Sequence, residues 1–176
     1  MLQTTLSKKV LEKYLNPYFV ETGTSDGSGV SLALQFEFKK IFSVELDEPL
    51  QKQNIDKFTN EINSKKLSLI IGDSLFELCN IINDLDERTT FWLDAHVDFG
   101  PKGLKKCPLY EELECIAKSD IKNHTILIDD MRILGSHWGE GIYLDELKKI
   151  ILNINPEYKF KFEDGFVPND ILVAYV

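Results

Sequence analysis

Cysteine is scarce in this chain of 176 residues, and long hydrophobic runs are absent. The three cysteines (Cys79, Cys107 and Cys115) are odd in number, and none follows another in a CxxC spacing. This pattern predicts neither a disulfide framework nor a zinc knuckle, and it favours a reducing, cytoplasmic compartment. Because no apolar stretch approaches the roughly eighteen residues of a membrane-spanning helix, we expect no membrane span.

Positive charge is also in short supply. Lysine and arginine number 20 against 29 aspartates and glutamates, which gives a formal net charge of −9. Neutralisation of phosphates supplies most of the affinity of proteins for nucleic acids. The charge therefore argues against a nucleic acid as the main partner.

The length and the ordinary hydrophobic fraction of 43% predict one globular domain spanning residues 1–176. Residues 1–16 predict an amphipathic helix that packs on the core of this domain. Its apolar face would consist of Leu6, Val10, Leu11, Tyr14 and Leu15.

Five apolar runs, rich in β-branched and aromatic residues, each end in polar residues. They span residues 18–24, 41–47, 67–74, 90–96 and 125–131. Short, nearly continuous apolar runs are typical of strands buried on both faces of a parallel sheet. Segments long enough for crossover helices lie between them, at residues 27–38, 48–62, 74–84 and 108–119. The alternation predicts an α/β, Rossmann-like fold with helices on both faces of the sheet.

The pattern changes after residue 131. Residues 139–156 have helical periodicity, residues 158–165 alternate as a half-exposed strand does, and residues 165–176 end in an apolar strand. We expect an antiparallel C-terminal pair to close a mostly parallel, seven-stranded sheet, with the last strand the more buried of the two.

The polar residues that follow the five runs have a shared position in this fold. All parallel strands point the same way, so their ends meet at the carboxyl edge, where open α/β sheets bind ligands. Any one acidic residue there could be only a helix cap, but five such ends favour a functional site. The residues brought together would be Glu21, Glu45, Asp73, Asp94, His96, Asp129 and Asp130.

The stretch FVETGTSDGSG, residues 19–29, holds three glycines between the first strand and the next helix. Glycine serves where the backbone needs a positive φ or where a ligand comes close. The spacing of Gly23, Gly27 and Gly29 is G-x3-G-x-G, which differs from the dinucleotide motif G-x-G-x-x-G. The loop precedes a helix N-terminus with unpaired N–H groups, so it suits a nucleotide-like ligand of another kind.

The ends of the second and third strands extend this site. Glu45 is placed to accept hydrogen bonds from both hydroxyls of a ribose, and Asp73 with Ser74 could hold an adenine amino group. Together with the glycine loop, they predict a nucleoside site.

The three segments VETGTSDGSG, SVELD and GDS resemble the first three motifs of class I S-adenosylmethionine-dependent methyltransferases. The resemblance covers nearly the whole chain, including the two closing strands. It implies that S-adenosylmethionine is the cofactor and that the glycines make room for it. The cofactor-binding residues that it implies are Glu21, Gly23, Thr24, Gly27, Gly29, Glu45, Asp73, Ser74 and Asp94.

A second group of residues follows the fourth and fifth strands, in FWLDAHVDFG and ILIDDMR. Asp94 and the pair Asp129–Asp130 would converge, and converging carboxylates have raised pKa values unless a cation lies between them. Mg²⁺ prefers such oxygen ligands, and it could bind two vicinal substrate hydroxyls and make one more acidic. His96 could then act as a general base.

One aspartate after the fourth strand and an Asp-Asp pair after the fifth resemble metal-dependent sugar O-methyltransferases of the macrocin type. The resemblance implies Asp94, Asp129 and Asp130 as metal ligands, His96 and Asp94 as catalytic residues, and a sugar or other small hydroxylated molecule as the acceptor. This chain is short and has no obvious substrate domain or lid, so a partner subunit in a homodimer could cover the site.

Other interpretations remain open. A metal-dependent hydrolase could use Asp94, His96, Asp129 and Asp130, although it would leave the glycine loop unexplained. A non-catalytic nucleotide-binding protein could keep the same fold, and a dinucleotide-dependent reductase fits least. Asp94 could bind only the methionine amino group of the cofactor, and Asp130 could only cap a helix.

Three further features are weaker candidates. His137 and Trp138 lie in a glycine-flanked segment that could cover a substrate. The lysine-rich loop 99–108 could also cover the acceptor. His124 precedes the fifth strand at its amino end, and we expect it to be structural.

Overall fold

The computed structural model describes residues 4–96, 107–136, 139 and 141–176. All five predicted parallel strands are present, and the two C-terminal strands follow them. The strands are β1 (Tyr18–Thr22), β2 (Lys40–Glu45), β3 (Leu67–Ile71), β4 (Thr89–Leu93), β5 (Thr125–Ile128), β6 (Lys159–Glu163) and β7 (Ile171–Tyr175).

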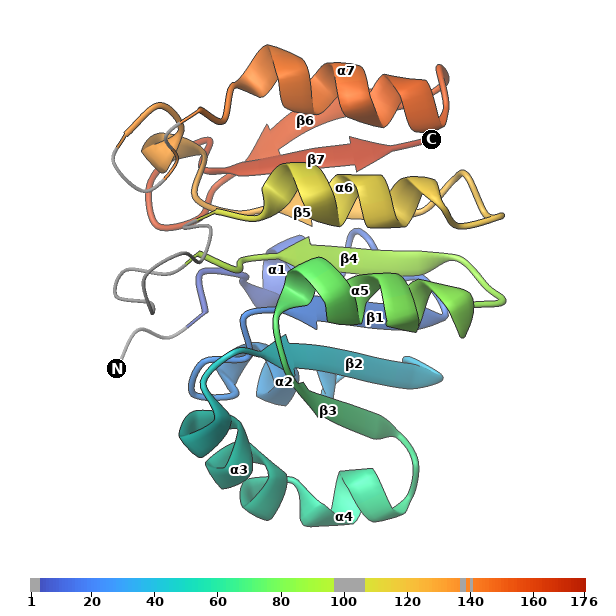
Figure 1. Ribbon diagram of the computed structural model, residues 1–176, viewed down its shortest axis with the longest axis vertical. Helices are drawn as coiled ribbons and strands as arrows, with labels where there is room; N and C mark the ends of the chain where they lie inside the picture. Colours follow the sequence, from blue (N-terminus) through green and yellow to red (C-terminus); the bar gives the residue numbers. More distant parts are fainter. Residues whose placement is uncertain (1–3, 97–106, 137–138, 140) are drawn as a thin grey trace.

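One sheet contains all seven strands in the order β3-β2-β1-β4-β5-β7-β6. The pairs among β1 to β5 are parallel, whereas β7 runs antiparallel to both β5 and β6. The C-terminal pair extends the sheet at one end and does not close it, since β3 and β6 remain as edges (Figure 1). As predicted, β7 is buried over most of its length and β6 is largely not.

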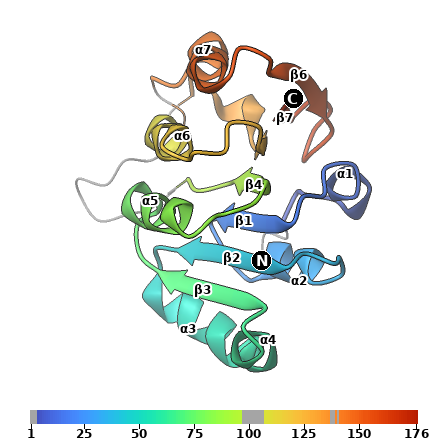
Figure 2. The same cartoon turned by 90° about the vertical axis from the view of Figure 1, so that its right-hand side faces the viewer.

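Helices cover both faces of the sheet. They are α1 (Lys8–Leu11), α2 (Ser28–Ala33), α3 (Glu48–Lys57), α4 (Thr59–Asn63), α5 (Ser74–Asn83), α6 (Leu109–Ala117) and α7 (Leu144–Ile154), with a 3₁₀ turn, η1, at Met131–Ile133. Helices α5, α6 and α7 pack side by side on one face, and α1 and α2 lie on the other (Figure 2). Burial of apolar side chains between these layers stabilises the fold. No helix among the described residues is both long and apolar enough to cross a membrane.

The N-terminal segment differs from the predicted helix over residues 1–16. Among its described residues only Lys8–Leu11 are helical, with Ser7 as the N-cap. The residues before this helix contact other elements: the Thr4 N–H donates to Ser28 Oγ (2.7 Å) and the Thr5 hydroxyl donates to Asp129. These tertiary contacts hold the segment across the carboxyl edge of the sheet, so it does not extend the helix. Four residues of the predicted apolar face are buried, and Leu15 is 47% exposed.

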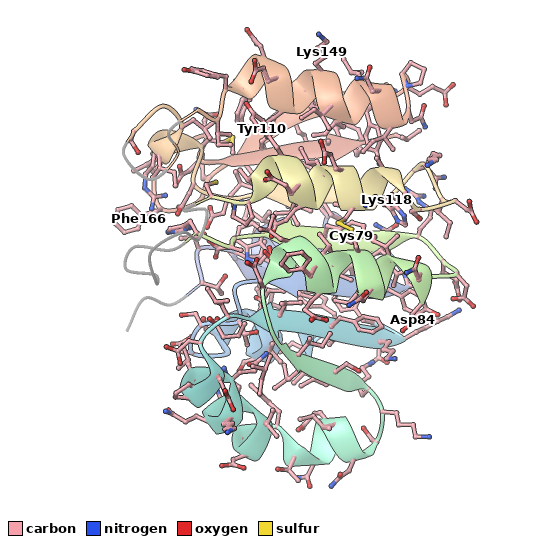
Figure 3. All side chains as sticks on the ribbon, viewed as in Figure 1. Cys79, Asp84, Tyr110, Lys118, Lys149 and Phe166 are labelled. Atoms are coloured by element: carbon pink, nitrogen blue, oxygen red, sulfur yellow. A yellow bond between two sulfur atoms is a disulfide. The ribbon has the colours of Figure 1, made fainter. Side chains whose placement is uncertain are left out.

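A disulfide joins Cys79 of α5 to Cys115 of α6 (Figure 3), contrary to the expectation from the sequence. The two cysteines are 36 residues apart, but the packing of α5 against α6 brings their Cα atoms to 4.8 Å. This separation lies within the range that a disulfide spans. Cys107 is free and buried.

His124 is structural, as expected. Its ring is buried at the amino end of β5, where Nδ1 accepts from the Thr89 N–H (3.1 Å) and Nε2 lies 2.9 Å from Ser119 Oγ. Burial lowers the pKa of His124 to about 4. Residues 99–106 of the lysine-rich loop and the pair His137–Trp138 lie outside the described residues.

Candidate active site

A cavity of about 1080 Å³ opens at the carboxyl edge of the parallel strands. It is large enough for a nucleoside-sized ligand together with a second small molecule. Every predicted site residue lines it except Gly27. Those that do are Glu21, Gly23, Thr24, Gly29, Glu45, Asp73, Ser74, Asp94, His96, Asp129 and Asp130.

The three glycines between β1 and the first turn of α2 lack a side chain for a reason that the sequence did not suggest. A Cβ on Gly23 would lie 2.6 Å from the Asp94 carbonyl oxygen, and a Cβ on Gly27 would lie 2.6 Å from Asn54 Oδ1. A Cβ on Gly29 would overlap Oε1 of Glu21. Gly23 and Gly27 also have positive φ values of 86° and 76°. Each missing side chain therefore makes room for the protein itself, although Gly23 and Gly29 still border the cavity.

Glu21 takes part in a buried polar network beneath the loop. Adjacent positions in the β1–β2 register bring its Oε2 within 2.5 Å of Ser43 Oγ, which donates to it. The Thr24 hydroxyl lies 2.7 Å from Ser43 Oγ and accepts from Gln51 Nε2 (3.0 Å). Burial is the main cause that raises the pKa of Glu21 to about 8, although the Ser43 hydrogen bond lowers it. Ser43 and Gln51 were not predicted. The only signal for Ser43 was a polar residue within an apolar strand, and Gln51 gave none, since it lies in the largely polar helix α3.

Glu45 ends β2 with its carboxylate fixed by the backbone. The Ser25 N–H donates to Oε2 (2.8 Å) and the Asp47 N–H donates to Oε1 (2.9 Å). Asp73 is the N-cap of α5 and accepts from the Leu75 N–H (3.0 Å). These contacts hold both carboxylates at neighbouring strand ends on the wall of one cavity.

The backbone hydrogen bonds between β1, β4 and β5 continue for one residue beyond the strands. They bring the carboxylates of Asp94 and Asp129 to the same edge. The Asp94 N–H donates to the Thr22 carbonyl (3.2 Å) and the Asp129 N–H donates to the Leu93 carbonyl (3.1 Å). Burial, reinforced by Asp129 and Asp130, raises the pKa of Asp94 well above its ordinary value. Burial also raises the pKa of Asp129 to about 7, against the lowering effect of the Thr5 hydrogen bond.

His96 lies among these carboxylates. Its Nε2 is 3.3 Å from Asp130 Oδ2, and its Nδ1 is 3.8 Å from Asp94 Oδ1. One possible ligand atom from each of Asp94, His96 and Asp130 lies within 4.8 Å of the others. The predicted trio of Asp94, Asp129 and Asp130 is thus divided, because Asp129 groups with Asp130 and Asp170.

Arg132 and Asp170 also belong to this cluster, although neither was predicted as a site residue. The Arg132 guanidinium forms ion pairs with Asp130 and Asp170. Asp170 lies just before β7, about 40 residues after Asp130. It reaches the cluster because the C-terminal strands β6 and β7 pair beside β5. The Arg132 side chain therefore provides part of the positive charge that was expected from a metal alone.

The sequence matches no protein-family model, and a search of curated proteins gave no match. Solved structures do match. An O-methyltransferase from Bacillus cereus, in complex with S-adenosylhomocysteine, has a TM-score of 0.62 at 14% identity, over 96% of this chain and 78% of that one. The O-methyltransferase TomG from Streptomyces achromogenes, in complex with S-adenosylmethionine, has a TM-score of 0.61 at 10% identity, over 96% and 77% of the two chains.

A protein from Streptococcus mutans, described as a methyltransferase and bound to S-adenosylhomocysteine, matches over 100% of both chains, with a TM-score of 0.60 and 14% identity. This chain has the class I methyltransferase fold. At such low identities the likeness shows the fold, whereas the chemistry has to be argued from the site.

The cavity of this methyltransferase fold is suited to S-adenosylmethionine by its donors and acceptors. Glu45 presents a fixed carboxylate on the cavity wall, and Asp73 and Ser74 lie at the next strand end. A divalent metal is also compatible, since Asp129 Oδ1 is buried without a hydrogen-bond partner among the described residues.

The raised pKa of Glu21 predicts how stability depends on pH. The folded protein keeps the Glu21 proton up to about pH 8, whereas the unfolded chain releases it near 4.5. The stabilisation is complete below the lower value and is lost as pH rises to the upper one, by up to about 1.4 kcal/mol per pH unit. In Glu21→Gln this loss should disappear.

Urea unfolding of both proteins across this pH range, in a chelator, measures the effect. The difference in free energy of unfolding between wild type and Glu21→Gln should decrease steadily with pH. Glu48→Gln, on an exposed helix position, is the control. Parallel curves for wild type and Glu21→Gln would mean that Glu21 is ionised in the folded protein.

Proposed function

We propose that the protein transfers a methyl group from S-adenosylmethionine to a hydroxyl of a small acceptor. The observation that carries the proposal is that a single cavity contains two chemically different sites. At one end Glu45 is held by backbone N–H groups, and at the other His96 lies between carboxylates. The first suits a nucleoside and the second suits an acid–base step.

In this proposal Glu45 binds the ribose diol, Asp73 and Ser74 bind the adenine edge, and Glu21 and Asp94 face the methionine part. S-Adenosylmethionine supplies the methyl group. The acceptor oxygen forms a bond to the methyl carbon as the carbon–sulfur bond breaks, and the hydroxyl proton passes to His96. Asp94 and Asp130 flank the ring at hydrogen-bonding or near hydrogen-bonding distance, and a positioned imidazole is the commonest general base in enzymes. Alignment of the two reactants in one cavity would supply much of the acceleration.

We further propose that a Mg²⁺ ion binds at Asp130, with Asp94 on one side and Asp129 on the other as candidate ligands of the two groups. The ion would make the acceptor hydroxyl more acidic. The acceptor that we favour is a sugar or a glycoconjugate, since carboxylates on the wall accept hydrogen bonds from hydroxyls. The exposed ring of Phe166 at the rim offers a surface for stacking.

A second copy of the chain could cover the opening. The cytoplasm remains our proposed location, although the Cys79–Cys115 disulfide argues against a reducing compartment.

Calorimetric titration of S-adenosylhomocysteine into metal-stripped protein tests the cofactor. We expect low-micromolar binding, with altered heats when Mg²⁺ is present. Asp129→Asn should keep the binding of S-adenosylhomocysteine and lose the effect of Mg²⁺. Asp145→Asn, an exposed position on α7, should behave as wild type.

Absence of binding with and without Mg²⁺ would refute the proposed methyltransferase and leave the hydrolase interpretation. Transfer of a tritiated methyl group to glycosides, compared with catechols, then tests the acceptor class. Label on catechols alone would contradict the sugar proposal.

A further inference from the structure

Arg132 is held in place by Asp170. Its backbone N–H donates to Asp170 Oδ1 (3.0 Å) and its guanidinium pairs with Asp170 Oδ2. The Met131 N–H donates to the Asp170 carbonyl (2.9 Å), which fixes the start of η1 against the end of the loop before β7. Since the same guanidinium nitrogen also reaches Asp130, Asp170 directs a positive charge onto the acidic cluster.

Asp130 is the carboxylate that both possible ligand groups share. It belongs with Asp94 and His96 on one side and with Asp129 and Asp170 on the other. Any ion in this part of the cavity that uses Asp130 must therefore come close to the guanidinium on the same carboxylate. Two cations a few ångströms apart repel strongly in a partly buried site.

The Arg132 guanidinium also contacts an aromatic ring, which offers it a position away from Asp130. The Arg132 side chain is 35% exposed, and its guanidinium carbon lies 4.9 Å from the centre of the Phe166 ring. Phe166 is 69% exposed at the carboxyl edge of the sheet (Figure 3). An aromatic ring stabilises a nearby guanidinium, so Arg132 could leave Asp130 without losing Asp170 or Phe166.

We propose that Arg132 is a resident cation that competes with the divalent ion for Asp130. The inference rests on the metal site of the proposed function. When no ion is bound, Arg132 neutralises Asp130 and reduces the repulsion among the carboxylates. When an ion binds, the guanidinium moves from Asp130 toward Phe166. The metal affinity is therefore set by Arg132 as well as by the ligands.

Calorimetric titration of metal-stripped protein with Mg²⁺ or Mn²⁺ alone tests this competition. Arg132→Gln should bind the ion at least tenfold more tightly than wild type, because Asp130 becomes free and a repelling charge is removed. Lys149→Gln removes the same charge from the outer surface of α7 (Figure 3) and should leave the affinity unchanged. Equal or weaker binding by Arg132→Gln than by wild type would overturn the inference.

A measurement on the wild-type protein avoids any folding defect of the variant. Arg88 and Arg132 are the two arginines of the sequence, so their Nε–Hε signals can be assigned by NMR. Addition of Mg²⁺ should shift the Arg132 signal with the same midpoint as the calorimetric titration. The Arg88 signal, from a side chain that donates to the Asn123 carbonyl, should not move. Ion binding that leaves Arg132 unmoved would refute the competition.

The titration of S-adenosylhomocysteine separates this inference from the proposed function. If neither wild type nor Arg132→Gln binds an ion, both the competition and the metal assistance are wrong. If S-adenosylhomocysteine still binds in that case, the proposed methyl transfer stands without a metal.

Discussion

Gly29→Ala is expected to destabilise the protein by roughly 3 kcal/mol, a value typical of severe overpacking in a buried site. Alanine within a helix normally gains up to about 1 kcal/mol over glycine. Here the added Cβ would overlap Oε1 of Glu21 and lie 2.9 Å from its Cδ. The Glu21 carboxyl has little freedom to move, since it is buried and accepts from Ser43 Oγ.

A double-mutant cycle isolates this cause. In a Glu21→Ala background the overlap is gone, so Gly29→Ala should become neutral or stabilising by up to about 1 kcal/mol. Urea denaturation of wild type, both single variants and the double variant measures the four free energies of unfolding. Additive effects of the two substitutions would show that Glu21 is not what excludes a side chain at residue 29.

The same variant separates two explanations of the glycine loop. If Gly29 were bare only to admit the cofactor, Gly29→Ala would fold with wild-type stability and lose affinity for S-adenosylhomocysteine. The structure instead predicts a loss of stability. Glycine spacing in a sequence indicates that space is needed, but it does not say whether a ligand or the protein fills that space.

The order of strands and helices could be predicted because buried parallel strands have a distinctive pattern of apolar runs. That pattern also placed Glu45, Asp73, Asp94 and Asp129 at one edge, since Glu45 ends its strand and the other three come one or two residues after theirs. The length of α1 could not be predicted in the same way. Its extent depends on contacts of Thr4 and Thr5 with distant residues, and amphipathic spacing carries no information about these.

Contacts between distant elements account for the rest of what the sequence missed. The Cys79–Cys115 disulfide depends on how α5 packs against α6, and the position of Asp170 depends on how β7 returns beside β5. Arg132 follows the Asp129–Asp130 pair by two residues, so a possible counter-charge was visible in the sequence. Only the fold shows that it turns back onto Asp130.

Glu45→Ala is expected to weaken the binding of S-adenosylhomocysteine about a hundredfold. In the proposed function its carboxylate accepts hydrogen bonds from both ribose hydroxyls. Hydrogen bonds to a charged group are each worth about 1.5–3 kcal/mol, and a hundredfold change in affinity corresponds to about 2.8 kcal/mol. Part of the loss would come from the Ser25 and Asp47 N–H groups, which hold the carboxylate in wild type and lose their acceptor.

Two further variants distinguish a ribose contact from a general effect of charge or loop structure. Glu48→Ala removes the same charge three residues away, from an exposed pair with Lys52, and should bind S-adenosylhomocysteine as wild type does. Glu45→Gln keeps the size of the side chain and one acceptor oxygen, so its loss should be about tenfold. If Glu45→Ala and Glu48→Ala bind equally well, the ribose does not lie at the end of β2. A glycine loop and a fixed carboxylate at successive strand ends would then have to be explained without a nucleoside between them.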